Sequence, residues 1–426
     1  MFRILVLLLT VVPTTFLHAA ESNDLNQFVA SLKQLVEADS AVKIQKNNLE
    51  SSETSSSLAN YRYLPKVTAF GRHSRGSSPL GTSSTNGYGF ETSWNLYRFG
   101  ADKASVESIK TNSQLQQEQL VSETLEAESR YATLLIELIA LDQEIEVKQN
   151  FIKLRKDALE MAQKLYRSGF KPREDVDKLT IDLDTEVSSH ADLVTQKESA
   201  LAALRSQQID ITPPHLNWPF DGYIGSEGFG KLLGEARTAN LLEQHPELRA
   251  KELQVQQSLN RITESRSGYL PSLDLATTHG WTVDNEAKTD PQWGSTARLE
   301  LTVPLFDGMR SYSTYQESVE AHTVAQLEIE KTSKALSATK EKMILELQNA
   351  EQNIRQRKRA LGTSKNLFET ALKGFQKGLI SANDLRFEEE RVLGSELRVI
   401  ETTANAHKSL VNLCHVLGKS LEKCLI

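Results

Sequence analysis

Residues 138–166, LIALDQEIEVKQNFIKLRKDALEMAQKLY, carry an apolar side chain at every seventh position. That spacing indicates a coiled-coil seam, in which the helix is slightly underwound so that one stripe keeps facing its partner. Core packing in an ordinary helical bundle also places apolar residues on one helix face. The stripe consists of Leu138, Ile145, Ile152, Leu159 and Tyr166.

The stripe occurs a second time, 209 residues further along the chain, with every position again apolar. Other segments recur at offsets of 206, 208 or 209 residues, so the chain is an internal duplication. The duplication and the length of the pattern favour the coiled-coil interpretation. The second stripe consists of Leu347, Ile354, Leu361, Phe368 and Phe375. The other recurring pairs are Tyr63-Leu64-Pro65 with Tyr269-Leu270-Pro271, Leu96-Tyr97-Arg98-Phe99-Gly100 with Leu305-Phe306-Asp307-Gly308, Tyr166-Arg167-Ser168-Gly169 with Phe375-Gln376-Lys377-Gly378, and Asp175-Val176 with Asp384-Leu385.

The duplication divides the chain into a first repeat at residues 21–210 and a second repeat at residues 236–426. A linker at 211–235 joins them. It begins with a proline-rich run and continues into a glycine-rich turn that reaches Gly230.

Residues 1–20 have the layout of a secretory signal peptide. A charge at Arg3 is followed by an apolar stretch from Ile4 to Val12 and by a small-residue end. We expect cleavage close to Ala20, and therefore export from the cytoplasm. No later segment is apolar enough for a membrane helix, so a membrane location would require β-strands.

The composition argues against several classes of function. A net charge of −7 argues against nucleic acid as a partner. The nine histidines have no metal-binding spacing, and no His-Glu-x-x-His or Gly-x-Ser-x-Gly motif occurs. We therefore expect no enzymatic activity and no cofactor. Cys414 and Cys424 can either pair in an oxidising compartment or remain two unpaired thiols near the C-terminus.

Two long stretches lack a helix breaker. No proline occurs between Pro79 and Pro172 or after Pro304, which predicts uninterrupted helices at about 100–168 and 308–376. Each would have ~68 residues and a length of ~100 Å. Shorter helices are expected at about 24–60, in two pieces, and at about 173–206 and 382–417.

Each repeat also contains a segment with a period of two, at about 64–97 and 270–306. One face is apolar and aromatic, whereas the other is polar or charged. This alternation fits a strand between lipid and water, although a half-buried strand of a soluble sheet gives the same pattern. Polar loops are expected at 75–86 and 282–292. The lipid-facing residues would be Tyr88, Phe90, Trp94 and Leu96 in the first repeat and Leu299, Leu301, Val303 and Leu305 in the second.

Four strands cannot close a barrel, and open sheet edges are not tolerated in lipid. The smallest membrane barrels have about eight strands. Two copies would supply about eight strands and three would supply about twelve, and only the larger number leaves room for a water-filled lumen. If the strands span a membrane, the sequence therefore favours a homotrimer.

These features together resemble the TolC-type outer-membrane efflux protein family. The resemblance rests on Tyr-Leu-Pro before each hairpin, on the Leu-Tyr-Arg-Phe-Gly or Leu-Phe-Asp-Gly segment after it, and on a tip motif in each repeat. The two tip motifs are Tyr166-x-x-Gly169-x5-Asp175-Val176 and Phe375-x-x-Gly378-x5-Asp384-Leu385.

The resemblance implies a mainly α fold with a β membrane part. In it, a long α-helical coiled-coil barrel continues a twelve-stranded β-barrel that a trimer completes with four β-strands per chain. It also implies contact with outer-membrane lipid and a location in the bacterial outer membrane that extends into the periplasm. The implied partners are a periplasmic adaptor protein and an inner-membrane pump or exporter.

The resemblance assigns roles at the two tips as well. Glycine there would allow a sharp reversal after a long helix. Asp384 and Asp175 match the acidic position of a periplasmic gate, although either residue could instead be the N-cap of the following helix. Phe387 stands where some members carry a second acidic residue, so the constriction would be partly apolar. The adaptor-facing residues would be Arg167, Ser168, Gly169 and Phe170 at the first tip and Lys377, Gly378, Leu379 and Ile380 at the second.

The expected function is thus a passive exit duct of a tripartite efflux pump or type I secretion system, gated at the periplasmic helix tips. The alternative is a periplasmic or surface-exposed structural or adhesive coiled-coil protein. That alternative would explain the helices but not the two aromatic hairpins. Drugs, metals and proteins are all possible cargoes, and the sequence does not distinguish them.

Overall fold

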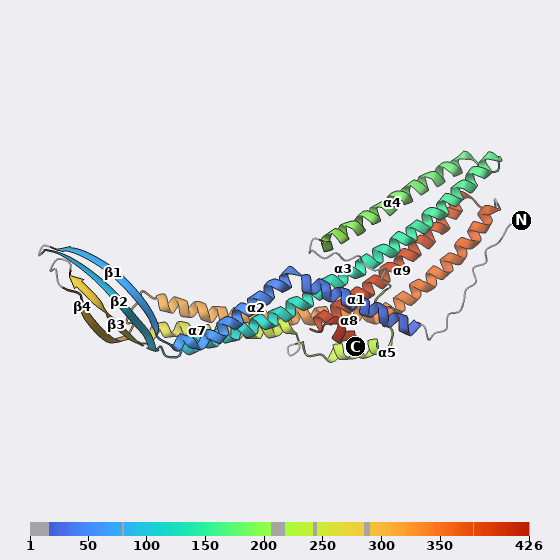
Figure 1. The fold of residues 1–426 in the computed structure, drawn as a ribbon. Helices are drawn as coiled ribbons and strands as arrows, with labels where there is room; N and C mark the ends of the chain where they lie inside the picture. Colours follow the sequence, from blue (N-terminus) through green and yellow to red (C-terminus); the bar gives the residue numbers. More distant parts are fainter. Residues whose placement is uncertain are drawn as a thin grey trace. The chain divides into compact units, whose positions relative to one another are not determined.

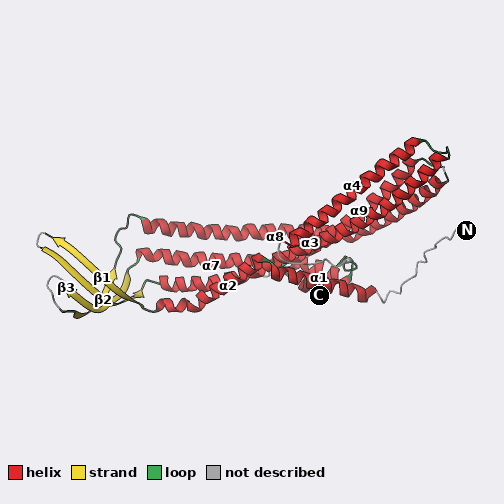
Figure 2. Cartoon of the chain, turned by 45° about the horizontal axis from the view of Figure 1, so that its top comes forward, coloured by secondary structure: helices red, strands yellow, loops and turns green. Residues whose placement is uncertain are grey.

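The computed structural model describes residues 17–78, 81–205, 218–241, 245–284, 290–377 and 379–425. These residues form a mainly helical chain with one four-stranded antiparallel sheet, which confirms the predicted fold class (Figures 1 and 2). The chain divides into two compact units. The first unit comprises 1–43, 122–245 and 335–426, and the second comprises 44–121 and 246–334.

The long helices have the predicted lengths. Helix α3 (Ala101–Arg167) and helix α8 (Arg310–Gln376) contain 67 residues each. Each is followed by a shorter helix, α4 (Arg173–Arg205) or α9 (Ala382–Val416). The absence of proline permits this length, because every interior N–H can bond within its own helix.

Of the ten stripe positions, three are buried and six are half-buried, as expected for a helix face that packs against other helices. Leu138 is buried on α3, and Leu347 and Phe375 are buried on α8. Tyr166, the counterpart of Phe375, is instead exposed. The two repeats therefore differ at their last stripe position, where α3 ends at Arg167.

Helix α1 (Leu17–Ala38) is separated by Asp39 from helix α2 (Ser40–Leu58), of which residues 44–58 belong to the second unit. The Asp39 carboxylate accepts hydrogen bonds from the N–H groups of Ala41 (2.7 Å) and Val42 (3.2 Å), which caps α2. It also accepts from the Tyr131 hydroxyl at 2.6 Å and from Arg130 at 2.8 Å. Burial opposes ionisation of Asp39, but these bonds hold its pKa below the ordinary value.

The cysteines pair. The Cys414–Cys424 disulfide fastens helix α10 (Leu421–Leu425) to α9. The Leu421 N–H donates to Glu128 on α3 at 3.0 Å, and Glu422 forms an ion pair with Lys33 on α1 at 2.8 Å. The disulfide therefore holds a C-terminal cap over two other helices of the first unit.

The linker is partly helical, contrary to the prediction of a turn reaching Gly230. Helix α5 (Glu227–Thr238) begins inside it, because Ser226 is an N-cap that accepts from the Phe229 N–H at 3.2 Å. Phe229 is also buried, so tertiary packing overrides the poor helix propensity of glycine there. Residues 211–217 lie outside the described residues. So do residues 1–16 of the predicted signal peptide, whose cleavage stays a prediction.

The second unit contains the sheet and the helices that lead into it. Helix α7 (Pro246–Arg266) and the 3-10 turns η1 (Ala59–Tyr63) and η2 (Ser267–Tyr269) precede the hairpins. The strands are ordered β1-β2-β3-β4 with every neighbour antiparallel. Their bounds are β1 (Lys66–Ser78), β2 (Gly81–Tyr97), β3 (Ser272–Asp284) and β4 (Gln292–Thr302).

Two strand boundaries differ from the prediction. The expected loop at 75–86 is largely strand, since Ser78 pairs with Gly81 and the ladder continues through a polar sequence. Backbone pairing can extend through residues of weak strand propensity when a neighbouring strand is already in register. Strand β4 ends at Thr302, before Pro304, which has no N–H to donate. Val303 and Leu305 therefore lie in the connection after the strand.

Strands β2 and β3 approach closely at a pair of glycines. Gly89 is paired with Gly280 across the ladder. A Cβ atom on Gly89 would lie 2.2 Å from the His279 carbonyl oxygen, and one on Gly280 would lie 2.5 Å from that of Tyr88. Glycine is thus required at both positions, as at the bends of curved sheets.

Candidate functional site at the helix tips

The first tip is the turn from α3 to α4. The Phe170 N–H donates to the Leu165 carbonyl at 2.9 Å, and the Gly169 N–H donates to that of Tyr166 at 3.0 Å. Gly169 has φ 77°, which confirms the left-handed turn predicted from the sequence. Arg167, Ser168, Gly169 and Phe170 are all exposed.

The second tip is the turn from α8 to α9. The Leu379 N–H donates to the Gly374 carbonyl at 2.9 Å, the counterpart of the Phe170 bond in the first tip. Lys377 and Leu379 are exposed, whereas Ile380 is partly buried against the core between the tips. Ile380 therefore packs inward rather than facing outward as predicted. Gly378 lies outside the described residues.

An apolar cluster joins the two tips. Its buried members come from all four helices: Ala162 of α3, Leu179 of α4, Phe375 of α8 and Leu385 of α9. Lys171 connects the tips further, because its ammonium donates to the Ile380 carbonyl at 3.0 Å. The same ammonium lies 4.9 Å from the Phe375 ring centre. The two hairpins are thus held together at their turns.

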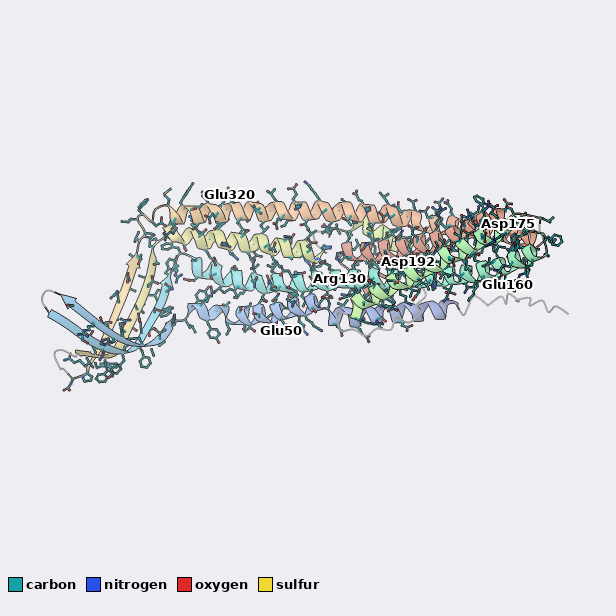
Figure 3. All side chains as sticks on the ribbon, turned by 90° about the horizontal axis from the view of Figure 1, so that it is seen from above. Glu50, Arg130, Glu160, Asp175, Asp192 and Glu320 are labelled. Carbon is teal, nitrogen blue, oxygen red and sulfur yellow. A yellow bond between two sulfur atoms is a disulfide. The ribbon has the colours of Figure 1, made fainter. Side chains whose placement is uncertain are left out.

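Neither tip aspartate is an N-cap, which corrects one of the two roles considered above. Ser381 is the N-cap of α9, and Asp384 is the third helical residue, with its carboxylate accepting from the Ser381 N–H at 3.1 Å and hydroxyl at 2.7 Å. These bonds hold the pKa of Asp384 below its ordinary value. Asp175, labelled in Figure 3, likewise follows the first residue of α4 by two positions. It forms an ion pair with Lys171 at 3.3 Å.

Large apolar side chains are exposed around these carboxylates. Phe170 is 80 % exposed and Leu379 is 76 % exposed. Phe387 is 60 % exposed, and the Arg391 guanidinium lies 4.8 Å from its ring centre. Exposed apolar groups of this size, set among charges, are typical of a surface that another protein covers.

A buried ion network next to the tips was not predicted. Arg155 on α3 forms an ion pair with Glu389 on α9 at 2.8 Å and with Glu186 on α4 at 3.4 Å, and donates to the Asp182 carbonyl at 2.6 Å. Lys148 also pairs with Glu186, at 2.7 Å. Burial raises the pKa of Glu389, and the Arg155 charge opposes that rise. The available sequence signal was the spacing of Arg155, which lies three positions after Ile152 and four before Leu159 and therefore on the helix face of the stripe.

The sheet carries the second group of predicted residues. Tyr88, Phe90, Trp94 and Leu96 of β2 and Leu299 and Leu301 of β4 are exposed. The register aligns Tyr88 with Trp281 and Trp281 with Trp293, so these three aromatics share one face. The two tryptophan rings lie 5.3 Å apart in a T-shaped arrangement. Sequence reasoning missed both, because their alignment depends on the register between strands.

Among the described helices, none is both long and apolar enough to cross a membrane. Within the same residues, no group of three or more His, Cys, Asp or Glu side chains is placed to hold a metal ion.

Comparison with known protein families identifies the family to which the chain belongs. The family model described as outer membrane efflux protein matches residues 30–207 and 238–419. The chain belongs to the outer membrane efflux protein family. The model matches the chain twice, which confirms the duplication, and the two matches fall on the two predicted repeats. The family is one of channels rather than enzymes.

Solved structures of outer-membrane proteins share the fold of this chain. The Vibrio cholerae outer membrane protein VceC is 15 % identical, with a TM-score of 0.79 over 92 % of this chain and 97 % of VceC. The Campylobacter jejuni outer membrane channel CmeC is 13 % identical, with a TM-score of 0.78 over 91 % of this chain and 85 % of CmeC. The open-state Neisseria gonorrhoeae outer membrane channel MtrE is 17 % identical, with a TM-score of 0.73 over 92 % of this chain and 89 % of MtrE. No curated protein matches by sequence.

Proposed function

We propose that this chain is the exit duct of a tripartite efflux pump or type I secretion system. Three copies form a twelve-stranded barrel in the outer membrane, and their helices continue the duct through the periplasm. Conduction is passive, and an inner-membrane pump or exporter joined through a periplasmic adaptor supplies the energy. Membership of the outer membrane efflux protein family supports this proposal over a structural or adhesive coiled coil.

The observation that carries the proposal is the incomplete sheet. Strands β1 and β4 each pair on one side only within the described chain. One face presents exposed aromatic and aliphatic side chains, among them Tyr88, Phe90 and Leu299. The other face is polar and includes Glu91 and Glu300, which pair across the ladder with Thr278 and Asp274. In lipid such a sheet needs neighbours at both edges.

Two adjacent residues of β4 provide a matched test. Leu301→Lys places a charge on the apolar face, where a lysine costs up to ~2–4 kcal/mol, depending on its depth in the bilayer. Glu300→Lys places the same lysine one position earlier in β4, on the polar face of the sheet. We expect Leu301→Lys to lower the yield of heat-resistant trimer in outer-membrane fractions, while Glu300→Lys assembles normally. Equal yields from the two variants would refute a lipid-facing role for this face.

The adaptor-docking surface is proposed to be the tips, through the exposed residues Arg167, Ser168, Gly169, Phe170, Lys377 and Leu379. Gly378, which lies outside the described residues, stays part of this prediction. A photo-crosslinking residue at Arg167 or Lys377 should capture a periplasmic protein in cells, which mass spectrometry then identifies. The same residue at Lys103, in the first turn of α3, is the control. Capture at Lys103 but not at the tips would contradict the docking assignment, and the captured protein would indicate the cargo.

The gate is proposed to combine Asp384 and Asp175 with the apolar Phe387. Asp384→Asn removes a charge but keeps an acceptor for Ser381, whereas Ser381→Ala weakens the cap and keeps the charge. In planar bilayers, Asp384→Asn should lower cation selectivity and Ser381→Ala should not. Because the pKa of Asp384 is lowered, wild-type selectivity should persist down to about pH 4. Selectivity unchanged by Asp384→Asn would remove this residue from the gate.

A further inference from the structure

A cleft of about 360 Å³ lies in the first unit, between α8, α9 and the turn that precedes α5. It is separate from the tips described above. Its apolar wall consists of Phe220, Ile224 and Ile354. The rest of the lining is polar or charged: Asp221 and Gly222 of the turn, Glu351, Arg355 and Lys358 of α8, and His407 of α9. This volume falls within the range of small-molecule pockets, roughly 300–1,000 Å³.

His407 is the unusual member of this lining. Only 1 % of its surface is exposed, and the Trp218 and Phe220 rings lie 5.2 and 5.3 Å from its own ring. Burial, together with the charge of Lys358, lowers the pKa of His407 to about 3, so the imidazole is neutral. Its Nδ1 is shielded from solvent and has no hydrogen-bond partner among the described residues.

An unpaired imidazole nitrogen of this kind is costly. Leaving a buried polar atom without a partner is destabilising, and folded proteins rarely do so. A group that enters the cleft and pairs with Nδ1 would recover that energy.

The two cations of the cleft differ in their partners. Arg355 forms an ion pair with Glu351 one helical turn away. Lys358 forms no ion pair with any described residue, and its side chain is exposed. Among the charged groups of the lining, Lys358 and Asp221 thus have no ion pair with a described residue, and the Lys358 ammonium is the available positive charge beside the apolar wall.

Two glycines set the backbone conformation of the turn that precedes α5 and borders the cleft. Gly222 and Gly225 have φ 84° and 97°, conformations that other residues rarely adopt. A Cβ atom on Gly225 would lie 2.6 Å from Cδ of Glu351, so the turn sits directly on α8. The cleft is consequently preformed and does not depend on a ligand to assemble its walls.

We propose that this cleft binds a small organic anion with an apolar body, such as an alkyl-substituted aromatic carboxylate. The carboxylate pairs with the Lys358 ammonium and accepts a hydrogen bond from His407 Nδ1–H. The apolar body packs on Phe220, Ile224 and Ile354. The site goes beyond the proposed duct function, because it requires neither the barrel nor the tips.

Calorimetry on the purified full chain in non-ionic amphipol tests the proposal, with 4-butylbenzoate as probe and uncharged 4-butylbenzamide as its matched analogue. We expect one saturable benzoate site per chain, with no saturable binding of the benzamide. Lys358→Gln and His407→Phe should each weaken benzoate binding at least tenfold. Arg359→Gln, one residue along α8 and outside the cleft lining, should leave it unchanged.

Equal binding of the two probes, or wild-type affinity in Lys358→Gln, would overturn the proposal. So would the absence of a saturable benzoate site. Lys358 is exposed, so its substitution should not impair folding and decides the matter even if His407→Phe is unstable. Channel conductance of Lys358→Gln should remain at the wild-type level, which separates failure of this site from failure of the duct.

Discussion

Replacing Arg155 by methionine should loosen the contact between the two helical hairpins in a pH-dependent way. The Arg155 side chain is 6 % exposed, and its guanidinium is the ion-pair partner of Glu389 at 2.8 Å. Methionine keeps much of the volume but removes the charge. Glu186 retains Lys148 at 2.7 Å, so Glu389 is the carboxylate left without a cation.

The size of the effect follows from the burial of this pair. Removing one partner of a buried ion pair costs ~3–5 kcal/mol, because the other charge remains buried and uncompensated. This loss would increase the equilibrium constant for opening the contact between the hairpins by roughly a hundredfold to several thousandfold. Replacing both partners, as in Arg155→Met/Glu389→Leu, should restore most of the loss, because no buried charge remains.

The pH dependence has a definite sign. The pKa of Glu389 is already raised by burial against the pull of Arg155, and loss of Arg155 should raise it further. A carboxyl group with a raised folded-state pKa binds protons more readily when folded, so stability increases as the pH falls toward its ordinary value. The Arg155→Met variant should therefore recover up to ~1.4 kcal/mol per pH unit between neutrality and about pH 4.5.

Hydrogen exchange of the α9 backbone around Glu389 measures this opening directly, after correction for intrinsic exchange rates at pH 7 and pH 5.5. Lys156→Met, an exposed neighbour on α3, is the control and should change protection by less than about threefold. If Arg155→Met exchanged like the control at pH 7, or if its protection did not recover at pH 5.5, the assignment of a structural role to the buried pair would be wrong.

Three further outcomes are expected. Reduction of the Cys414–Cys424 disulfide, or its replacement by serines, should destabilise the C-terminal cap by about 3 kcal/mol for a loop of this size, and hydrogen exchange of α10 measures the loss. Gly89→Ala should abolish assembly of heat-resistant trimer, because its Cβ would lie 2.2 Å from the His279 carbonyl oxygen, whereas Gly71→Ala, with no atom within 4 Å, should be tolerated. Because the pKa of His407 is lowered to about 3 by burial and by Lys358, the free energy of unfolding should fall by ~1.4 kcal/mol per pH unit below about pH 6.5, and His407→Leu should flatten that slope in denaturant titrations.

Local patterns were sufficient to predict the architecture. The seven-residue stripe through Leu138 and the absence of proline predicted α3 and α8 to within two residues, because helix formation depends on short-range spacing and breakers. The alternation around Tyr88 predicted β2 for the same reason. Recurring motifs predicted the duplication and the family, since these are properties of the order of residues along the chain.

The arrangement of contacts was decided by tertiary structure. Ile380 packs inward while its neighbour Leu379 is exposed, although both were predicted to face the adaptor. Tyr166 is exposed where Phe375 is buried, although the two occupy the same position of the repeated stripe. The pairing of Arg155 with Glu389 joins residues 234 positions apart. The packing of Trp218 and Phe220 on His407 joins the linker to α9. Burial and partner choice depend on which segments meet in space, and no periodicity within one segment carries that information.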